Sequence, residues 1–196
     1  MIAYVGQSGN SSDIYVFDLE SKSSRKITDD IFSDAYPAWN GDGTTIAFVS
    51  DRSNKTSGHY EGQMHDHDYR QTDIYTVNID TRRIERITDT DHNESHPVWA
   101  QTSNKLFYTS DYNGVWNLYV HPLEDDTELE PYAVTNVLTG LQQPTLSKDD
   151  KLLIFAGYSG IGWDLYSMAN PLQLKRQTVN PTQFILNGGS EESSIA

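Results

Sequence analysis

The segment YPAWNGDGTTIAFVS, from Tyr36 to Ser50, is the strongest indication of the fold, because variants of it return twice further along the chain. The second copy is HPVWAQTSNKLFYTS, from His96 to Ser110, and the third is QPTLSKDDKLLIFAG, from Gln143 to Gly157. In each copy a proline precedes a turn-forming stretch and then an apolar triplet. A repeat of this kind marks a structural unit that buries its apolar face only against its neighbours.

The residues inside each unit follow the pattern of β-hairpins. Apolar positions alternate or form short β-branched and aromatic runs, and turn residues such as Gly41-Asp42-Gly43 separate them. No stretch repeats apolar residues at helical spacing over three turns. After the triplet comes an acidic or amide residue, then an aliphatic residue and Tyr, and the unit ends on Thr. These motifs are Asp13-Ile14-Tyr15, Asp73-Ile74-Tyr75, Asn117-Leu118-Tyr119 and Asp164-Leu165-Tyr166, followed by Thr28, Thr88, Thr135 and Thr178.

We therefore predict an all-β protein, a β-propeller of four-stranded antiparallel blades with about four blades present, as part of a larger propeller or multidomain protein. The inner strand would begin at the proline, and the other three would carry the triplet, the Tyr motif and the final Thr. The step from Pro97 to Pro144 is close to the ~40–50 residues of a propeller blade. Trp39 and Trp99 are expected to pack between blades. The predicted propeller spans 1–178, with an incomplete blade over 1–28 and complete blades over 29–88, 89–135 and 136–178.

The ends of the chain depart from the repeat. Ile2-Ala3-Tyr4 precedes its Tyr motif by the same interval as the later triplets, so we expect the chain to begin on the second strand of a blade. The start lacks the features of a signal peptide. Either the protein is cytosolic or its true N-terminus is missing, and the register favours the second. For 179–196 we favour an exit linker with a disordered tail over a clasp in which Gln183 to Leu186 completes the first blade.

The composition is acidic. Across 196 residues, 28 Asp and Glu oppose 14 Lys and Arg, for a net charge of −14, which argues against nucleic acid or an anionic membrane as a partner. No apolar run approaches the ~20 residues of a transmembrane helix, so no direct membrane insertion is predicted. The chain has no cysteine, which excludes disulfides and thiol catalysis. Asp51 and Arg52 are expected to form a local surface ion pair that stabilises little.

Blocks such as SDAYPAWNGDGTTIAFVSDRS and ESHPVWAQTSNKLFYTSD resemble the WD-repeat-like β-propeller repeats of the TolB type. The resemblance covers residues 2–178 and departs from the family pattern at Leu146, where the family has Trp. It implies an extracytoplasmic, periplasmic bacterial protein whose propeller is often joined to another domain. The propeller would serve either as a scaffold in an envelope assembly such as Tol-Pal or as the gating part of prolyl-oligopeptidase-like and tricorn-like peptidases.

The second unit is interrupted by an insertion from Ser53 to Gln71, SNKTSGHYEGQMHDHDYRQ. In a four-stranded blade this loop emerges on the same face as the interblade loop from Asp89 to Pro97, so we expect the two to be neighbours on one rim. Imidazole suits zinc, manganese or nickel, and carboxylates suit calcium, so a divalent cation site is one hypothesis. A polar surface loop that needs no cofactor is the preferred interpretation. The candidate metal ligands are His65, His67, Asp91, His92 and His96.

Two functions stay open. The chain has no Gly-x-Ser-x-Gly, His-Glu-x-x-His or Gly-x-Gly-x-x-Gly motif, and we identify no catalytic residue. The preferred function is a non-catalytic scaffold that binds a protein partner, including a membrane-associated complex. The alternative is the propeller part of an enzyme, either a peptidase gate or a metal-dependent polysaccharide lyase, which a remote similarity to the manganese-holding oligogalacturonate lyases suggests. The expected partner-binding rim residues are His59, Tyr60, Trp116 and Trp163.

Overall fold

The computed structural model describes residues 1–9, 11–53, 67–123 and 130–187. These residues form fourteen strands, a 3₁₀ turn and one short helix, and no helix among them is long and apolar enough to cross a membrane. The strands are Ile2–Ser8 (β1), Ser11–Asp18 (β2), Ser23–Lys26 (β3), Asp34–Trp39 (β4), Thr45–Ser50 (β5), Asp73–Asn78 (β6), Ile84–Arg86 (β7), Glu94–Trp99 (β8), Lys105–Ser110 (β9), Asn117–Pro122 (β10), Tyr132–Ala133 (β11), Leu141–Leu146 (β12), Leu152–Ser159 (β13) and Gly162–Ala169 (β14). The helical segments are Pro171–Gln173 (η2) and Gln183–Leu186 (α1).

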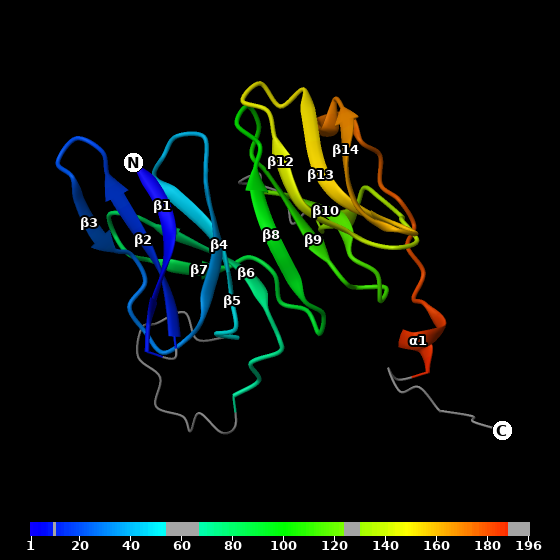
Figure 1. Cartoon of the computed structure of the whole chain (residues 1–196), viewed down its shortest axis with the longest axis horizontal. Helices are drawn as coiled ribbons and strands as arrows, with labels where there is room; N and C mark the ends of the chain where they lie inside the picture. The colour runs from blue at the N-terminus through cyan, green and yellow to red at the C-terminus, as the bar shows by residue number, and fades with distance from the viewer. Residues whose placement is uncertain (10, 54–66, 124–129, 188–196) are drawn as a thin grey trace.

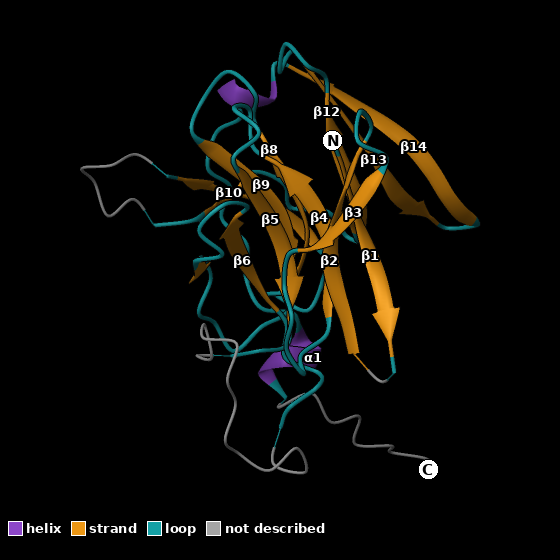
Figure 2. Ribbon diagram, turned by 90° about the vertical axis from the view of Figure 1, so that its left-hand side faces the viewer, coloured by secondary structure: helices purple, strands orange, loops and turns teal. Residues whose placement is uncertain are grey.

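The strands form four antiparallel sheets in which neighbours along the chain are neighbours in the sheet. The first sheet is β1-β2-β3, the second β4-β5-β6-β7, the third β8-β9-β10-β11 and the fourth β12-β13-β14. The sheets follow one another in chain order, with β1 and β2 against β4, β4 to β6 against β8, and β8 to β10 against β12. Figures 1 and 2 show this succession. The all-β prediction is confirmed, and within the described ranges no sheet closes on itself.

The register of the middle strands repeats from sheet to sheet. In each sheet an aromatic residue of the triplet strand stands opposite the Tyr of the next strand, so that the two side chains share a face. The pairs are Tyr4 with Tyr15, Phe48 with Tyr75, Tyr108 with Tyr119 and Phe155 with Tyr166. Their ring centroids lie 5.4, 5.9, 5.8 and 5.8 Å apart. The repeated sequence motif therefore encodes a repeated aromatic pair.

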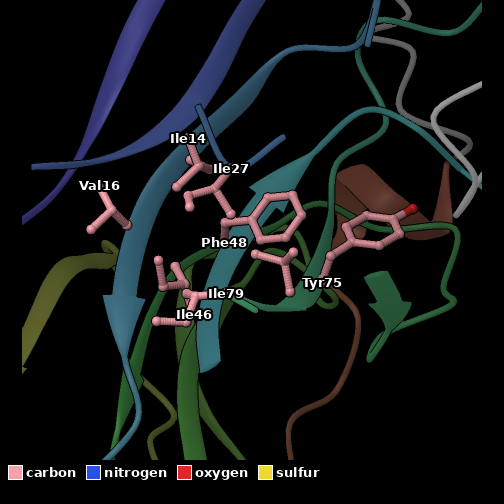
Figure 3. Packing of buried hydrophobic residues seen from close by; sticks show 8 residues of the cluster. Ile14, Val16, Ile27, Ile46, Phe48, Tyr75 and Ile79 are labelled. Atoms are coloured by element: carbon pink, nitrogen blue, oxygen red, sulfur yellow. The ribbon is translucent and has the colours of Figure 1, made fainter. Parts of the chain in front are cut away.

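The apolar core lies between the sheets. At the junction of the first and second sheets, Ile14 and Val16 of β2 pack with Ile46, Phe48 and other buried residues of the second sheet (Figure 3). The next two junctions contain equivalent clusters. Trp99 is buried in the second cluster, and Trp39 packs against the first, so the prediction that these residues lie between the sheets is confirmed.

The threonine that ends each unit has a structural role. Its buried side-chain oxygen accepts a hydrogen bond from the backbone N–H of the aliphatic residue in the Tyr motif. The bonds run from Ile14 to Thr28 (2.9 Å), from Ile74 to Thr88 (2.8 Å) and from Leu118 to Thr135 (2.9 Å). In the first three units this bond attaches the end of the unit to the strand that carries its Tyr motif.

The repeated prolines lie inside the inner strands rather than at their start. Pro37, for example, is the fourth residue of β4, and the pairing of β4 with β5 shifts register around it. The residue before each proline has a positive φ, at Tyr36 (52°), His96 (49°) and Gln143 (54°). A bulge removes the need for a ladder hydrogen bond from proline, which explains how an inner strand accommodates it.

In its described part, the end of the chain lacks the expected fourth strand of the last sheet, and it does not form the clasp that is the alternative to an exit linker. Thr178 does not end a fourth strand of the last sheet, because residues after η2 run back along the third sheet, where the Gln177 N–H donates to the Ala133 carbonyl (2.8 Å). Residues 183–186 form the helix α1 and not a clasp strand beside the first sheet. The Thr182 N–H donates to the Asn113 carbonyl (2.9 Å) and holds this segment to the third sheet as well. The tail from 188 onward lies outside the described residues.

The fourth sheet exposes one of its faces. Leu165 of β14 occupies the position that Leu118 occupies in β10 and Ile74 in β6, yet it is 80% exposed, whereas the other two are fully buried. Ile154 and Trp163 on the same face are also exposed. The described residues therefore cover this position in the first three sheets, where Ile14 is the equivalent residue of β2, and leave it open in the fourth.

The contrast between these equivalent leucines gives a test of the fold. We expect Leu118→Ala to lower the free energy of unfolding by about 2–5 kcal/mol, because it leaves a cavity in the third core cluster. We expect Leu165→Ala to change it by less than about 0.5 kcal/mol, because the side chain is already in water. Urea denaturation of both variants measures the difference, and equal effects would contradict the packing described.

Candidate functional site

Arg52 is a fully buried cation at the junction of the first two sheets. Its Nη2 donates to both carboxylate oxygens of Asp34 (2.6 and 2.8 Å), its Nη1 to Asp30 Oδ2 (2.8 Å) and its Nε to Ser50 Oγ (3.0 Å). The guanidinium carbon also lies 5.3–5.6 Å from the ring centroids of Phe32, Phe48 and Tyr75. The expectation of a weak surface pair between Asp51 and Arg52 is therefore wrong, because the side chain turns into the junction.

The carboxylates around Arg52 are compensated by the protein's own cations. Burial raises the pKa of Asp34 to about 6, and the charge of Arg52 opposes this rise. Asp13, which lies close to Asp30 and Asp34, is 2.9 Å from Lys26 Nζ. Among the described residues this is the one group of three acidic or His side chains with converging ligand atoms. These three carboxylates are already paired with Lys26 and Arg52, so we assign the group a structural role.

The predicted metal ligands do not form one group within the described part of the chain. His65 lies outside the described residues. His67 is buried, with Nε2 3.2 Å from Asp51 Oδ2 and its ring against Phe32 and Tyr69. The His92 ring contacts Tyr112, the His96 ring contacts Tyr36, and Asp91 is exposed. A metal on this rim stays a prediction.

The predicted rim residues lie apart along the fold. His59 and Tyr60 fall outside the described residues. Trp116 is half-buried and lines a pocket of about 490 Å³ together with Tyr36 and His96. Trp163 lies on β14, where it is 57% exposed and packs edge-on against Tyr158 at 5.6 Å.

A larger cleft, of about 770 Å³, lies between the end of the second sheet and the third sheet. We call it the tyrosine cleft, because four tyrosines line it. Tyr108 and Tyr119 stand on neighbouring strands with their rings stacked at 5.8 Å, and Tyr112 meets Tyr119 edge-on at 6.4 Å. Tyr132 carries the guanidinium of Arg176 5.0 Å from its ring centroid. The polar and charged lining residues are Thr88, Asp89, Thr90, Glu94, Ser110, His121, Glu130, Arg176, Gln177 and Thr178.

Glu94 is the buried acid of this cleft. It is the first residue of β8 and is 2% exposed, and its Oε1 accepts hydrogen bonds from the hydroxyls of Thr90 (2.8 Å) and Ser110 (3.1 Å). Its Oε2 accepts no hydrogen bond from a described residue, and the Tyr119 hydroxyl is likewise unbonded. Burial raises the pKa of Glu94 to about 7. The cleft therefore contains a carboxyl group with one free oxygen and a titration near neutral pH.

Sequence reasoning did not single out Asp34, took Arg52 for a surface residue, and placed Glu94 only in the polar loop from Asp89 to Pro97. The only local signal was the position of Asp34 and Glu94, each three residues before the repeated proline. The sequence of a unit does not show that these acids stand opposite Ser50 and Ser110 at the end of the same hairpin, because that contact depends on the strand register around the bulge.

No family model matches the chain. Solved structures show a likeness of fold. TolB from Acinetobacter baumannii has a TM-score of 0.66 at 20% identity, over 92% of this chain and 40% of that chain. The putative TolB from Agrobacterium tumefaciens has a TM-score of 0.61 at 16% identity, over 81% of this chain and 53% of that one. A prolyl endopeptidase has a TM-score of 0.58 at 17% identity, over 88% of this chain and 27% of that one.

The chain thus spans about half or less of each of these proteins. At such identities the likeness concerns the fold, and it supports a TolB-like β-propeller arrangement of the four sheets.

The buried pairing of Arg52 gives a stability prediction. We expect Arg52→Met to lower the free energy of unfolding by about 3–5 kcal/mol, because it leaves Asp34 without its partner in the junction. Arg83 forms an exposed ion pair with Glu85, so Arg83→Met should cost no more than about 1 kcal/mol. Chemical denaturation at pH 7 compares the two variants, and a similar cost for both would contradict a buried role for Arg52.

Glu94 gives a prediction about pH. The pKa of Glu94 is about 7 in the folded chain against 4.5 for an unperturbed Glu, so the folded state holds a proton that the unfolded state lacks between these values. The contribution of Glu94 to the free energy of unfolding therefore falls as pH rises from about 4.5 to 7 and is constant above, by roughly 1.4 kcal/mol per unit of pKa shift. Denaturation of Glu94→Gln across pH 4–8 should lack this fall relative to the unmodified chain. An identical pH dependence in both would refute it.

Proposed function

We propose that this chain is a non-catalytic recognition module of β-propeller type that binds a protein partner through the tyrosine cleft. The observation that supports this proposal is the cleft itself, in which four tyrosines surround one buried carboxyl group with a free oxygen. Tyrosine is enriched in protein interfaces because it offers a large apolar surface with a polar tip. Such residues also contribute most of the binding energy where they line a central pocket.

The walls of the cleft are well suited to hold an inserted side chain. Tyr108 and Tyr119 are buried and stand on neighbouring strands, so their positions are fixed before binding. Tyr112 is exposed and stands at the mouth. A pre-ordered wall loses little conformational entropy when a partner binds.

The cellular location of the protein and the assembly in which it acts are also proposals. The likeness to TolB supports an extracytoplasmic location and a role in a bacterial envelope assembly, including one that is associated with the membrane. Trp116 and Trp163, together with His59 and Tyr60, would then offer further contacts on the rim.

A second candidate is the non-catalytic propeller of an enzyme. It is favoured by the likeness to a prolyl endopeptidase, of which the chain matches 27%. In that case a catalytic domain would belong to the same polypeptide. A metal-dependent lyase would instead require His65 and His67 to share an ion, which elemental analysis of protein purified without chelator measures.

The tyrosine cleft is tested by substitution. We expect Tyr112→Ala to weaken the complex with the partner by at least about tenfold, because it removes an aromatic contact at the mouth of the cleft. Tyr158→Ala is the matched control, since Tyr158 is 42% exposed and Tyr112 44% exposed. The partner is first identified by placing a photo-crosslinking residue at position 112 or 158 in producing cells, and its affinity is then measured by calorimetry with purified proteins.

A partner that crosslinks only from position 112 and loses affinity only with Tyr112→Ala supports the proposal. A partner that crosslinks only from position 158, or that binds Tyr112→Ala unchanged, moves the interface to the fourth sheet and overturns it.

A further inference from the structure

The first two junctions between sheets share one framework. At both, an acid opens the inner strand, a serine ends the triplet strand, a threonine hydroxyl lies nearby, and two aromatic rings face each other across neighbouring strands. The corresponding residues are Asp34 and Glu94, Ser50 and Ser110, Thr28 and Thr88, Phe48 and Tyr108, and Tyr75 and Tyr119. The backbone register of these strands is the same in both sheets, so the side chains occupy equivalent places.

The two junctions differ in their cation. In the first, Arg52 follows the Ser50-Asp51 pair and places its guanidinium between Asp34 and the aromatic rings. In the second, the equivalent residue after Ser110-Asp111 is Tyr112, which is exposed at the mouth of the cleft. The acid is retained, but no cation of the described chain bonds to it. The second junction thus keeps the acid, the serine and the ring pair of the first without its guanidinium, and Thr90 and His92 stand where Asp30 and Phe32 contact Arg52.

The third junction shows what happens when the acid is lost as well. Leu141 stands in the place of Asp34, Gly157 in the place of Ser50 and Ser159 in the place of Arg52. Leu141 is fully buried in the third core cluster. A junction without the cation is therefore built with an apolar residue, which makes the retained Glu94 the exception. Burying an ionised carboxylate that has hydroxyl partners but no cation costs free energy, and a cationic ligand would offset this cost.

We propose that the tyrosine cleft is a receptor for a guanidinium cation, which takes beside Glu94 the place that the Arg52 side chain takes beside Asp34. Glu94 Oε2 would accept hydrogen bonds from the cation, and the rings of Tyr108 and Tyr119 would bind its faces, as Phe48 and Tyr75 do for Arg52. The unbonded Tyr119 hydroxyl and the Ser110 hydroxyl offer further acceptors.

The charges around Glu94 favour a cation. Arg176 is the one basic side chain that lines the cleft, and its guanidinium lies over Tyr132. Burial lowers the pKa of His121, so this side chain is neutral at pH 7. Asp73 and Asp89 also lie near Glu94, and Arg86 pairs with both of them (2.6 and 2.7 Å). The remaining titratable groups that face Glu94 are Tyr108, Tyr112, Tyr119 and Glu130, so the charge that a ligand would meet is that of Glu94 itself.

The source of the guanidinium links this inference to the proposed function. An arginine side chain of the protein partner is the source that we infer, and on this point alone the inference rests on the proposed function. A free guanidino compound has the same chemistry. The two are separated by comparing a peptide with a small molecule, and neither experiment requires the partner to be known.

The probes are acetyl-Gly-Arg-Gly-amide, the same peptide with citrulline in place of arginine, and agmatine. Citrulline keeps the shape of arginine but replaces the charged guanidinium with a neutral urea. We expect calorimetry and protein NMR at pH 8 to show saturable binding of the arginine peptide, with affinity at least tenfold above that of the citrulline peptide. Tighter binding of the peptide than of agmatine supports the partner as source, and the reverse supports a free guanidino compound.

Two variants locate the site. Glu94→Gln keeps the shape of the side chain, and we expect it to lower affinity for the arginine peptide at least tenfold. Glu85→Gln is the matched control, because it removes the same charge from an exposed carboxylate. We expect it to leave affinity within twofold. Circular dichroism confirms that both variants are folded.

Tyr112→Arg tests the internal analogy without any ligand. The new arginine would stand where Arg52 stands in the preceding sheet and would fill the cleft from within. We expect a rise in Tm and loss of peptide binding, and we expect the rise in Tm to disappear when Glu94→Gln is added. This dependence separates filling of the site from a general effect of added positive charge.

The proposal is overturned if the citrulline peptide binds as tightly as the arginine peptide, if Glu94→Gln leaves affinity unchanged, or if no probe binds at pH 8. Peptide binding that persists while no protein crosslinks from position 112 supports the guanidinium site and refutes the protein-partner function. The two failures are therefore distinguishable.

Discussion

The structure depends on a single constraint: each of these small sheets has two apolar faces, and only a neighbouring sheet covers them. A sheet of three or four strands cannot form its own core. The first sheet meets this constraint by packing Ile14 and Val16 against Phe48 and Tyr75 of the second, and the later sheets repeat the arrangement. The second and third sheets therefore each contribute half of two junctions, and a residue that is lost from one sheet changes the core that it shares with its neighbour.

The same stacking places polar groups in dry surroundings. The first residue of each inner strand and the last residues of the adjoining hairpin meet at one edge of the junction, where the aromatic pair covers them. Asp34 is tolerated there because Arg52 binds both of its oxygens, and because the guanidinium keeps its faces on aromatic rings. A buried ion pair adds little net stability relative to apolar packing, but removal of one member is costly. The pair thus holds the loop from Asp30 to Asp34 against the second sheet.

Features encoded within one unit were predictable from the sequence. The apolar triplets, the Tyr motifs and the Trp positions predicted the middle strands and the packing between sheets, because strand periodicity and turn residues are local signals. The pairing of Arg52 with Asp34 was not, because it depends on the register of the β4-β5 hairpin, in which Asp34 stands opposite Ser50, and on the Arg52 side chain turning inward after β5. The missing fourth strand of the last sheet was not predictable either. Residues near Gln177 bind the edge of the third sheet instead of the edge of the fourth. The spacing of apolar residues does not indicate which of the two edges they bind.

Repetition explains how one position changes the chemistry of a whole junction. Because the backbone register is shared, a residue substituted in one unit faces the same surroundings as its counterparts in the others. Arg52 fills the junction of the first two sheets. In the third junction Ser159 stands in the place of Arg52, and Leu141, in the place of the acid, makes the junction apolar. With Tyr112 in that place and Glu94 retained, the second junction has aromatic walls and an acid but no internal cation. In the first junction, the guanidinium of the chain itself pairs with the acid and stabilises the fold. In the second, a cation that pairs with the acid would have to come from outside the described chain.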